Sequence, residues 1–150
     1  MLKVGDQAPD IQVSTETGED FQLSAMKGKR VVLYFYPKAD TPGCTVEACE
    51  FRDDIKQFTK KGAVVIGVSP DKSVAQAKFK AKYDLPFTLL ADSDRAAAEA
   101  YGVYKEKNMY GKKVMGIERT TFVIAPDGKI EKIYSNVKAA GHAATVLEEL

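Results

Sequence analysis

The sequence predicts an α/β fold in which helices flank a mixed central sheet. Residues 30–36 (RVVLYFY) and 63–69 (AVVIGVS) are near-continuous apolar runs, which are typical of strands covered on both faces. A helical pattern joins the two runs and completes a β-α-β unit. Residues 120–135 carry two strand patterns around a Pro-Asp-Gly turn, which indicates an antiparallel hairpin. Parallel and antiparallel pairs together predict a mixed sheet.

The helix that joins the two runs is predicted over residues 41–61. Thr41 suits the N-cap, Pro42 suits the first helical position, and Gly62 follows the last turn. Farther along the chain, the patterns predict a helix over 73–83, a strand around 87–90, a short helix over 94–101 and a closing helix over 141–150.

Composition limits the classes of function. Residues 1–150 are expected to form a single domain with a core of its own. Lys and Arg number 22 against 21 Asp and Glu, so a net charge of +1 does not attract nucleic acid or an anionic membrane. The N-terminus lacks the apolar stretch of a signal peptide, and no run approaches the roughly 18 residues of a membrane helix. We therefore expect a cytoplasmic protein, in which thiols are more often catalytic or metal-binding than structural.

The two cysteines, Cys44 and Cys49, are the most informative residues. Their spacing of five is too long for a C-x-x-C redox pair and unsuited to paired zinc ligands. Cys44 falls in the first turn of the predicted helix, on an inward apolar stripe, and helix amides favour the reactive thiolate. Cys49 lies about 140° around the helix from it. From these features alone, core packing of Cys44 remains as open as a nucleophilic role, and for Cys49 a structurally idle thiol is favoured.

The segment PKADTPGCTVEACEFRD resembles the active-site segment of the peroxiredoxins. That family's pattern is Pro, three residues, Thr, two residues and Cys, met here by Pro37, Thr41 and Cys44. The stretch TPGCTVEACEFRD is similar to the bacterioferritin-comigratory-protein branch, also called peroxiredoxin Q, in which many members have a second cysteine five positions on. Weaker resemblances follow in the family's order along nearly the whole chain: GDQAPDIQV, GVSPD, YGVY, RTTFVIAPDGKI and GHAATVL.

The resemblance implies a thioredoxin-like fold with an N-terminal β extension, and a thiol peroxidase without cofactor or metal. Cys44 would attack hydrogen peroxide or an alkyl hydroperoxide and become a sulfenic acid, and Cys49 would resolve it as an intramolecular disulfide. A thioredoxin or similar dithiol reductant would be the partner of a monomeric enzyme. By the same resemblance, Thr41 would offer its hydroxyl to the peroxide, Pro37 would shield the pocket from water, and Arg119 would supply a cation.

The sequence also predicts roles for three polar residues, Thr41, Glu47 and His142. As an N-cap, Thr41 would accept a hydrogen bond from the helix backbone and keep its proton free for substrate. Glu47 lies one turn after Cys44, where a close carboxylate would disfavour the thiolate, so we expect it to be structural and paired with a cation. His142 is the single histidine, and we expect a surface or capping role.

Other functions are weighed against the peroxidase. A dithiol oxidoreductase would share the fold but needs the C-x-x-C motif, which is absent. A zinc site would find two Cys and one His, short of the usual four ligands. A non-catalytic binding module would consume peroxide only stoichiometrically.

The five-residue spacing itself predicts a conformational change. In an α-helix, Cα atoms five residues apart are roughly 8.6 Å apart, whereas a disulfide normally needs no more than about 6.8 Å. Cys44 and Cys49 therefore cannot bond while the helix is intact. We expect residues 41–52 to be helical in the reduced protein and substantially unwound in the oxidised one.

Overall fold

The computed structural model describes the backbone of residues 1–150 and every side chain except that of Met109. The elements in chain order are β1 (Gln12–Thr15), β2 (Asp20–Gln22), the 3-10 helix η1 (Leu23–Met26), β3 (Arg30–Phe35), α1 (Pro42–Asp53), α2 (Ile55–Lys60), β4 (Ala63–Ser69), α3 (Ser73–Tyr83), β5 (Thr88–Ala91), α4 (Ala96–Ala100), β6 (Tyr104–Met109), β7 (Lys112–Ile117), β8 (Thr120–Ile124), β9 (Ile130–Tyr134) and α5 (His142–Glu149).

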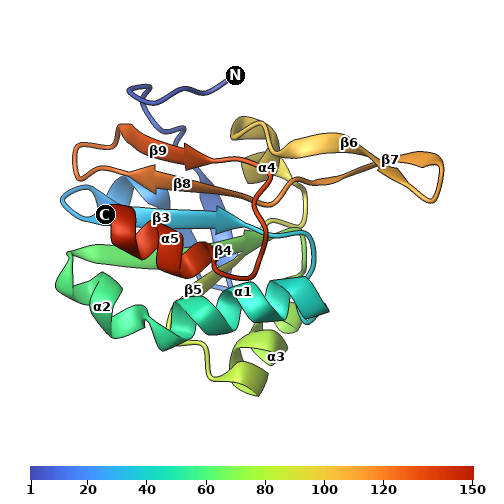
Figure 1. The fold of residues 1–150 in the computed structure, drawn as a ribbon, viewed down its shortest axis with the longest axis horizontal. Helices are drawn as coiled ribbons and strands as arrows, with labels where there is room; N and C mark the ends of the chain where they lie inside the picture. The colour runs from blue at the N-terminus through green and yellow to red at the C-terminus, as the bar shows by residue number, and fades with distance from the viewer.

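Over the described backbone, seven strands form one mixed sheet in the order β2-β1-β5-β4-β3-β8-β9 (Figure 1). β3 pairs in parallel with β4, and β4 in parallel with β5. β8 lies antiparallel to β3 and to β9. At the other edge β1 pairs antiparallel with β5, and β2 pairs antiparallel with β1. The predicted mixed sheet with an N-terminal β extension is confirmed.

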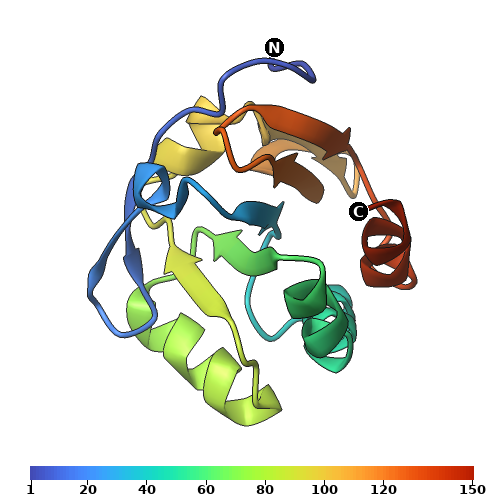
Figure 2. The ribbon, with the colours of Figure 1, turned by 90° about the vertical axis from the view of Figure 1, so that its left-hand side faces the viewer.

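The core has two layers because β3 is buried on both faces. Val32, Tyr34 and Tyr36 point to the face covered by α1, α2 and α5. Val31, Leu33 and Phe35 point to the opposite face, which α4 and the N-terminal segment cover. Figure 2 shows these helices on the two sides of the sheet. This double burial explains the continuous apolar run that predicted the strand.

The helix predicted over 41–61 is two helices, so that prediction is wrong. The backbone leaves helical geometry at Asp54, with φ −98° and ψ 5°, and α2 starts afresh from the carbonyl of that residue. Two aspartates in succession, Asp53 and Asp54, have low helix propensity, so a break here costs little. The other predicted helices and strands begin and end within about two residues of the observed ones.

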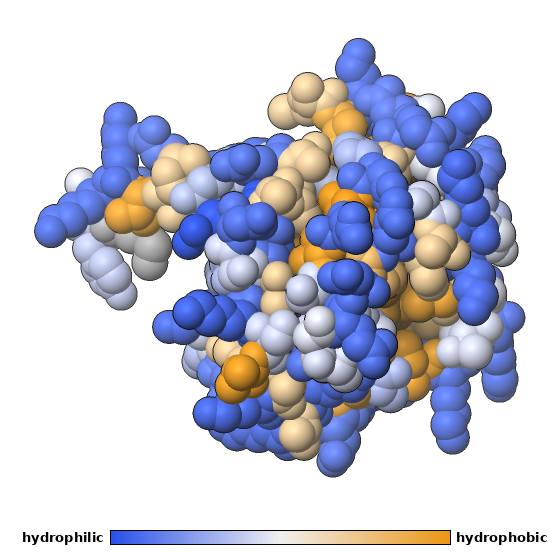
Figure 3. All heavy atoms as spheres, turned by 180° about the vertical axis from the view of Figure 1, so that it is seen from behind, coloured by the Kyte–Doolittle hydropathy of each residue, from blue (hydrophilic) through white to orange (hydrophobic). Residues whose placement is uncertain are grey.

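The hairpin of β6 and β7 was not predicted. Its turn is Tyr110–Gly111, where both residues have positive φ, the conformation of a tight two-residue hairpin turn. The hairpin projects beyond the body of the molecule, as Figures 1 and 3 show. Hydrophilic side chains cover most of the face in Figure 3, and apolar ones show between them mainly toward its middle. Within the described residues, no helix is long and apolar enough to cross a membrane.

Candidate active site

The candidate site lies where β3 ends and α1 begins. Residues 36–41 connect the two elements, and Pro37 is half-buried directly after the buried Tyr36. Asp71, which follows β4, accepts hydrogen bonds from the Ala39 N–H at 2.7 Å and the Ser69 hydroxyl at 2.6 Å. Because neighbouring parallel strands end at the same edge of the sheet, the loop after β4 can hold the loop after β3.

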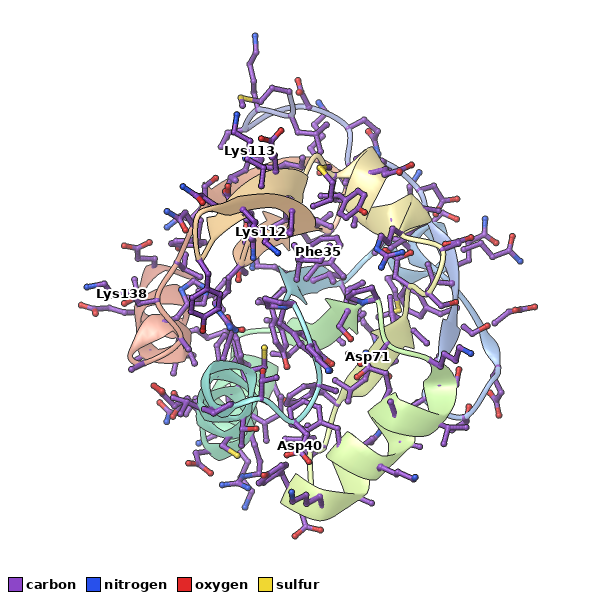
Figure 4. The ribbon with its side chains drawn as sticks, turned by 90° about the vertical axis from the view of Figure 1, so that its right-hand side faces the viewer. Phe35, Asp40, Asp71, Lys112, Lys113 and Lys138 are labelled. Carbon is purple, nitrogen blue, oxygen red and sulfur yellow. The ribbon has the colours of Figure 1, made fainter. Side chains whose placement is uncertain are left out.

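A second carboxylate, that of Asp40, holds this loop from the other side. Asp40 has a φ of 59°, an uncommon conformation for a residue other than glycine. Its carboxylate accepts hydrogen bonds from Lys82 Nζ at 2.9 Å and from the Tyr83 hydroxyl at 2.9 Å, both at the end of α3. Figure 4 looks onto this end of the sheet and shows Asp40 between α1 and α3. No local pattern in the sequence indicates these contacts of Asp40 and Asp71, although Asp71 belongs to the family-like stretch GVSPD.

Cys44 is buried in the first turn of α1, with 1% of its surface exposed. Pro42, two residues before Cys44, has no backbone N–H. The N–H groups of Gly43 and Cys44 belong to the first turn, where backbone N–H groups have no acceptor within the helix. The inward stripe predicted for α1 is present, since Cys44, Ala48 and Phe51 are all buried. The helix thus directs its positive end and its backbone donors toward the Cys44 region.

Arg119 lies directly before β8, whose first residue Thr120 pairs with Phe35 at the end of β3. This register brings Arg119 to Cys44 although the two are 75 residues apart in the chain. Arg119 Nη2 donates to Cys44 Sγ at 3.3 Å, and Nη1 donates to Glu47 Oε1 at 2.6 Å. Burial lowers the pKa of Arg119, but its electrostatic interactions and hydrogen bonds with Glu47 and Cys44 outweigh burial, so this pKa is raised. The guanidinium therefore stays charged between a thiol and a carboxylate.

Glu47 is fully buried beside this guanidinium. Its Oε1 accepts the bond from Arg119, whereas Oε2 has no hydrogen-bond partner among the described residues. Burial raises the pKa of Glu47 to about 7, and the charge of Arg119 opposes that rise. The expected pairing with a cation is observed, and the partner is Arg119. Glu47 therefore belongs to the site, although the sequence analysis left it outside the catalytic set.

Thr41 occupies the N-cap position of α1, as predicted, but its side chain behaves differently. Its hydroxyl donates to the Lys38 carbonyl oxygen at 2.8 Å, and in the described structure it accepts no bond from the helix backbone. The expectation of a capping oxygen with a free proton is wrong, because the tight loop before α1 brings the Lys38 carbonyl within reach. The lone pairs of the oxygen are left to accept a hydrogen bond.

Cys49 lies on the same helix as Cys44 but at intermediate exposure. Both cysteines are free thiols in the described structure. α1 is continuous from Pro42 to Asp53, so the structure has the intact helix in which a bond between the two sulfurs is geometrically excluded.

Lys107 of β6 is a second cation near the site that the sequence analysis missed. Burial lowers its pKa, the charge of Arg119 lowers it further, and Cys44 and Glu118 act in the opposite direction. The sequence contains little signal for this placement, because the charged residues of the hairpin form consecutive runs, 105–107 and 112–113, and not a strand-like alternation. Among the described residues, no group of three His, Cys, Asp or Glu side chains is placed to hold a metal ion.

His142 is buried, so the expected surface or capping role is wrong. Gly141 is the N-cap of α5, and His142, its first residue, turns onto the sheet. Its Nε2 lies 2.7 Å from Thr121 Oγ1 on β8. Its ring lies edge-on to those of Phe51 and Tyr134. Burial, with a contribution from the charge of Arg119, lowers the pKa of His142 to about 4.

The pH dependence of folding stability should report both buried groups. Between pH 4.5 and about 7 the folded protein binds more protons at Glu47 than the unfolded chain does, so the free energy of unfolding falls as pH rises. His142 has the opposite sign: between about pH 4 and pH 6.5 the unfolded chain binds more protons, so stability rises with pH. The two trends oppose each other in the wild type.

Glu47→Gln should remove the falling trend and leave the rising one. As pH rises from 4.5 to 7, we expect the free energy of unfolding of this variant to increase relative to that of the wild type, by on the order of 3 kcal/mol at most. Urea denaturation at a series of pH values measures the difference. Glu148→Gln, which removes an exposed carboxyl from α5, is the control. Parallel curves for the wild type and Glu47→Gln would contradict the titration assigned to Glu47.

The fold and the site together define a class, a thiol-based enzyme on a thioredoxin-like scaffold with one thiol held by a guanidinium. The sequence model of the AhpC/TSA family matches residues 4–133. The chain is 52% identical to a putative peroxiredoxin bcp of Coxiella burnetii, over 99% of each chain. It is 48% identical to peroxiredoxin Bcp of Bacillus subtilis, over 99% of this chain and 95% of that one.

A solved structure agrees with these relatives. The bacterioferritin comigratory protein of Xanthomonas campestris, which is described as having alkyl peroxide reduction activity, has a TM-score of 0.91 and 42% identity. The match covers 99% of this chain and 95% of that chain. The chain belongs to the AhpC/TSA family, in the peroxiredoxin branch named Bcp or Q, and is a thiol peroxidase. The fold, family and enzyme class predicted from the resemblance are confirmed.

Proposed function

We propose that Cys44 is the peroxidatic residue of this thiol peroxidase. The observation that carries the proposal is the 3.3 Å hydrogen bond from Arg119 Nη2 to Cys44 Sγ. A charged donor strengthens a hydrogen bond to an anion, so Arg119 favours the thiolate over the thiol. Helix N-terminal amides act in the same direction. Of the two thiols, Cys44 has both of these features, and Cys49 lies off the apolar stripe of α1.

The chemistry follows from these donors. The thiolate attacks the terminal oxygen of hydrogen peroxide or of an alkyl hydroperoxide, so an S–O bond forms while the O–O bond breaks. The departing oxygen takes a proton and leaves as water or an alcohol, and Cys44 becomes a sulfenic acid. Negative charge develops on the departing oxygen, and the fixed cation Arg119 lowers the barrier. Thr41 accepts a hydrogen bond from the peroxide O–H, and Pro37 shields the site from water.

Cys49 then resolves the sulfenic acid. Its sulfur attacks the sulfur of Cys44, the S–O bond breaks, and water leaves as the disulfide forms. A thioredoxin or similar dithiol reductant exchanges with this disulfide and restores both thiols. We propose that the enzyme is a monomer, and that it works in the cytoplasm, because the cycle needs a compartment that keeps thiols reduced.

Hydrogen exchange on the two redox forms tests the conformational part of this cycle. We expect amides in residues 41–52 to be protected in the reduced protein and to lose most of that protection on oxidation, because the 44–49 disulfide cannot form on an intact helix. The break at Asp54 gives the unwinding a natural end, so α2 should stay protected and serves as the internal control. Equal protection in both forms, with the disulfide confirmed by mass spectrometry, would contradict the prediction.

Gly43→Ala tests the approach of Arg119 to the thiol. A Cβ at this position would lie 3.2 Å from Arg119 Nη2, closer than most carbon contacts allow. Arg119 is also held by Glu47, so we expect the guanidinium to move away from Cys44 and the peroxidase rate to fall by about tenfold. The unfolding transition should change little, since Gly43 has an ordinary helical conformation. A wild-type rate in this variant would show that the contact is not needed.

The overall proposal is tested by peroxide consumption coupled to thioredoxin. Hydrogen peroxide and a bulky alkyl hydroperoxide should both be reduced through many turnovers. Stoichiometric consumption would favour a binding module, and reduction of insulin disulfides without peroxide would favour a dithiol oxidoreductase. Gel filtration of the reduced and oxidised forms tests the monomer, and cell fractionation tests the location.

A further inference from the structure

Two side chains tie the second half of α1 to distant parts of the molecule. Glu50 follows Cys49 directly and accepts a hydrogen bond from the Gly141 N–H, at 2.7 Å to Oε1 and 3.3 Å to Oε2. Arg52 donates from Nη1 to the Tyr83 carbonyl oxygen at 2.8 Å, at the end of α3. Both partners lie far from α1 in the chain. These contacts therefore hold the Cys49 end of the helix in place by tertiary structure.

The Glu50 contact has a specific electrostatic character. Gly141 is the N-cap residue of α5, and among the described side chains none from its own helix caps it. A carboxylate at a helix N-terminus satisfies a free amide and meets the positive end of the helix dipole. The anionic group at the N-terminus of α5 is therefore supplied by α1, through Glu50. The bond is to a charged acceptor, which makes it stronger than a neutral hydrogen bond.

The position of Glu50 couples this bond to the resolving step. For Cys49 to reach Cys44, α1 must unwind from its first turn through Cys49, and Glu50 is the next residue in the chain. The break at Asp54 limits the unwinding to α1, so α2 does not have to open. An unwinding that moves Cys49 toward Cys44 therefore pulls Glu50 away from Gly141.

We propose that Glu50 is a positioning residue for the resolving step: its carboxylate tethers the Cys49 end of α1 to the N-terminus of α5 and sets how readily the helix opens. This inference rests on the proposed resolving role of Cys49. In that step the sulfur of Cys49 attacks the sulfur of Cys44, the S–O bond of the sulfenic acid breaks, and water leaves. The tether resists only the opening, so it controls this step and leaves the attack on peroxide unchanged.

The tether also sets the lifetime of the sulfenic acid. While α1 stays closed, Cys44 keeps its sulfenic acid in the site that accepts peroxide, where a second peroxide can convert it irreversibly to the sulfinic acid. Faster opening shortens this interval. Glu50 therefore fixes the peroxide concentration at which the enzyme inactivates itself.

Rapid mixing with one equivalent of hydrogen peroxide tests the proposal. The reaction of the reduced protein is stopped with acid at successive times, and a specific reagent traps the sulfenic acid. Mass spectrometry then measures the fractions of trapped sulfenic acid and of disulfide at each time. We expect Glu50→Ala to form the disulfide about tenfold faster than the wild type, because one charge-assisted hydrogen bond no longer opposes opening. Glu50→Gln should show a smaller acceleration, since its amide oxygen can still accept the bond. Glu148→Ala, which removes an exposed carboxyl from α5, should match the wild type.

Two further readouts distinguish a tether from a merely structural residue. Sulfenic acid formation should keep its wild-type rate in Glu50→Ala, while the over-oxidised fraction at a given peroxide concentration should fall about as much as disulfide formation accelerates. The Gly141 amide should be protected from exchange in the reduced wild type and lose protection on oxidation. A merely structural role would lower the melting temperature without moving the ratio of disulfide to sulfinic acid.

Disulfide formation at the same rate in Glu50→Ala and Glu148→Ala would overturn the proposal, as would a Gly141 amide equally protected in both redox forms. Slower sulfenic acid formation in both Glu50 variants would overturn it as well, because Glu50 would then act on the peroxide step. Failure of the resolving role has a different signature: Cys49→Ser would turn over with the reductant at the wild-type rate. If Glu50→Ala does not fold, Glu50→Gln carries the same comparison.

Discussion

Cys44→Ser is expected to abolish peroxide reduction, a loss of at least about a thousandfold in the coupled assay. A serine hydroxyl at this position has almost the same size but is a far weaker nucleophile, so Arg119 Nη2 would face a neutral oxygen in place of the reactive sulfur. The substitution keeps the volume of a side chain that is 1% exposed, so the fold should be retained. Circular dichroism and the melting temperature confirm that the loss is chemical. Measurable turnover in this variant would contradict the assignment of Cys44.

Cys49→Ser is the matched control, because it makes the same replacement of sulfur by oxygen at the other cysteine. We expect it to react with one equivalent of peroxide at the wild-type rate and then stop, with the sulfenic acid on Cys44 open to over-oxidation. Trapping of the sulfenic acid followed by peptide mass spectrometry identifies the residue. A label on Cys49 in the wild type would reverse the two roles.

Arg119→Lys is expected to lower kcat/KM for peroxide by roughly a hundredfold, the effect of removing a donor that stabilises transition-state charge. Arg119 serves two acceptors at once, Cys44 Sγ through Nη2 and Glu47 Oε1 through Nη1. A lysine keeps the charge but is a point charge on a flexible chain, without the planar fork that fixes both directions. Steady-state kinetics with hydrogen peroxide measure the loss, and the alkylation rate of Cys44 reports the thiolate separately.

Arg30→Lys offers a control for the substitution itself. Arg30 forms a two-pronged pair with Glu131 at the other end of β3, at 2.8 and 2.9 Å. Six strand residues, about 20 Å, separate this end from the site. This variant should keep the wild-type peroxidase rate. If Arg119→Lys also kept it, the role of Arg119 would be rejected.

Local pattern sufficed for the elements with strong periodicity. β3, β4 and α3 were predicted to within about a residue, because double burial and helical periodicity leave signals over a few neighbouring positions. The break at Asp54 and the hairpin of β6 and β7 were missed. In the first case a helical pattern runs through the break. In the second case the strands are rich in charged residues and lie largely at the surface, so they lack the apolar runs that identify a buried strand.

Some site residues could likewise be located from the sequence, whereas most of their contacts could not. Pro37, Thr41, Cys44 and Cys49 lie in one segment, so a resemblance over that segment located them together. The predicted capping bond of Thr41 and the predicted surface or capping role of His142 are wrong, since each depends on which atoms a loop or a helix start faces. Glu47 was expected to pair with a cation, but its Oε2, which has no hydrogen-bond partner among the described side chains and backbone, had no signal in the sequence.

The sequence by itself determined the βαβ core, the position of Cys44 in the first turn of a helix, and a cysteine spacing that forbids a disulfide while that helix is intact. These properties depend on helical and strand geometry, which acts over a few residues. Tertiary structure alone decided that Arg119 joins Cys44 to Glu47, that Asp71 and Asp40 hold the loop, and that Glu50 caps α5. Each of these contacts joins residues at least 30 positions apart, and strand register and helix packing, not neighbouring residues, bring them within hydrogen-bonding distance.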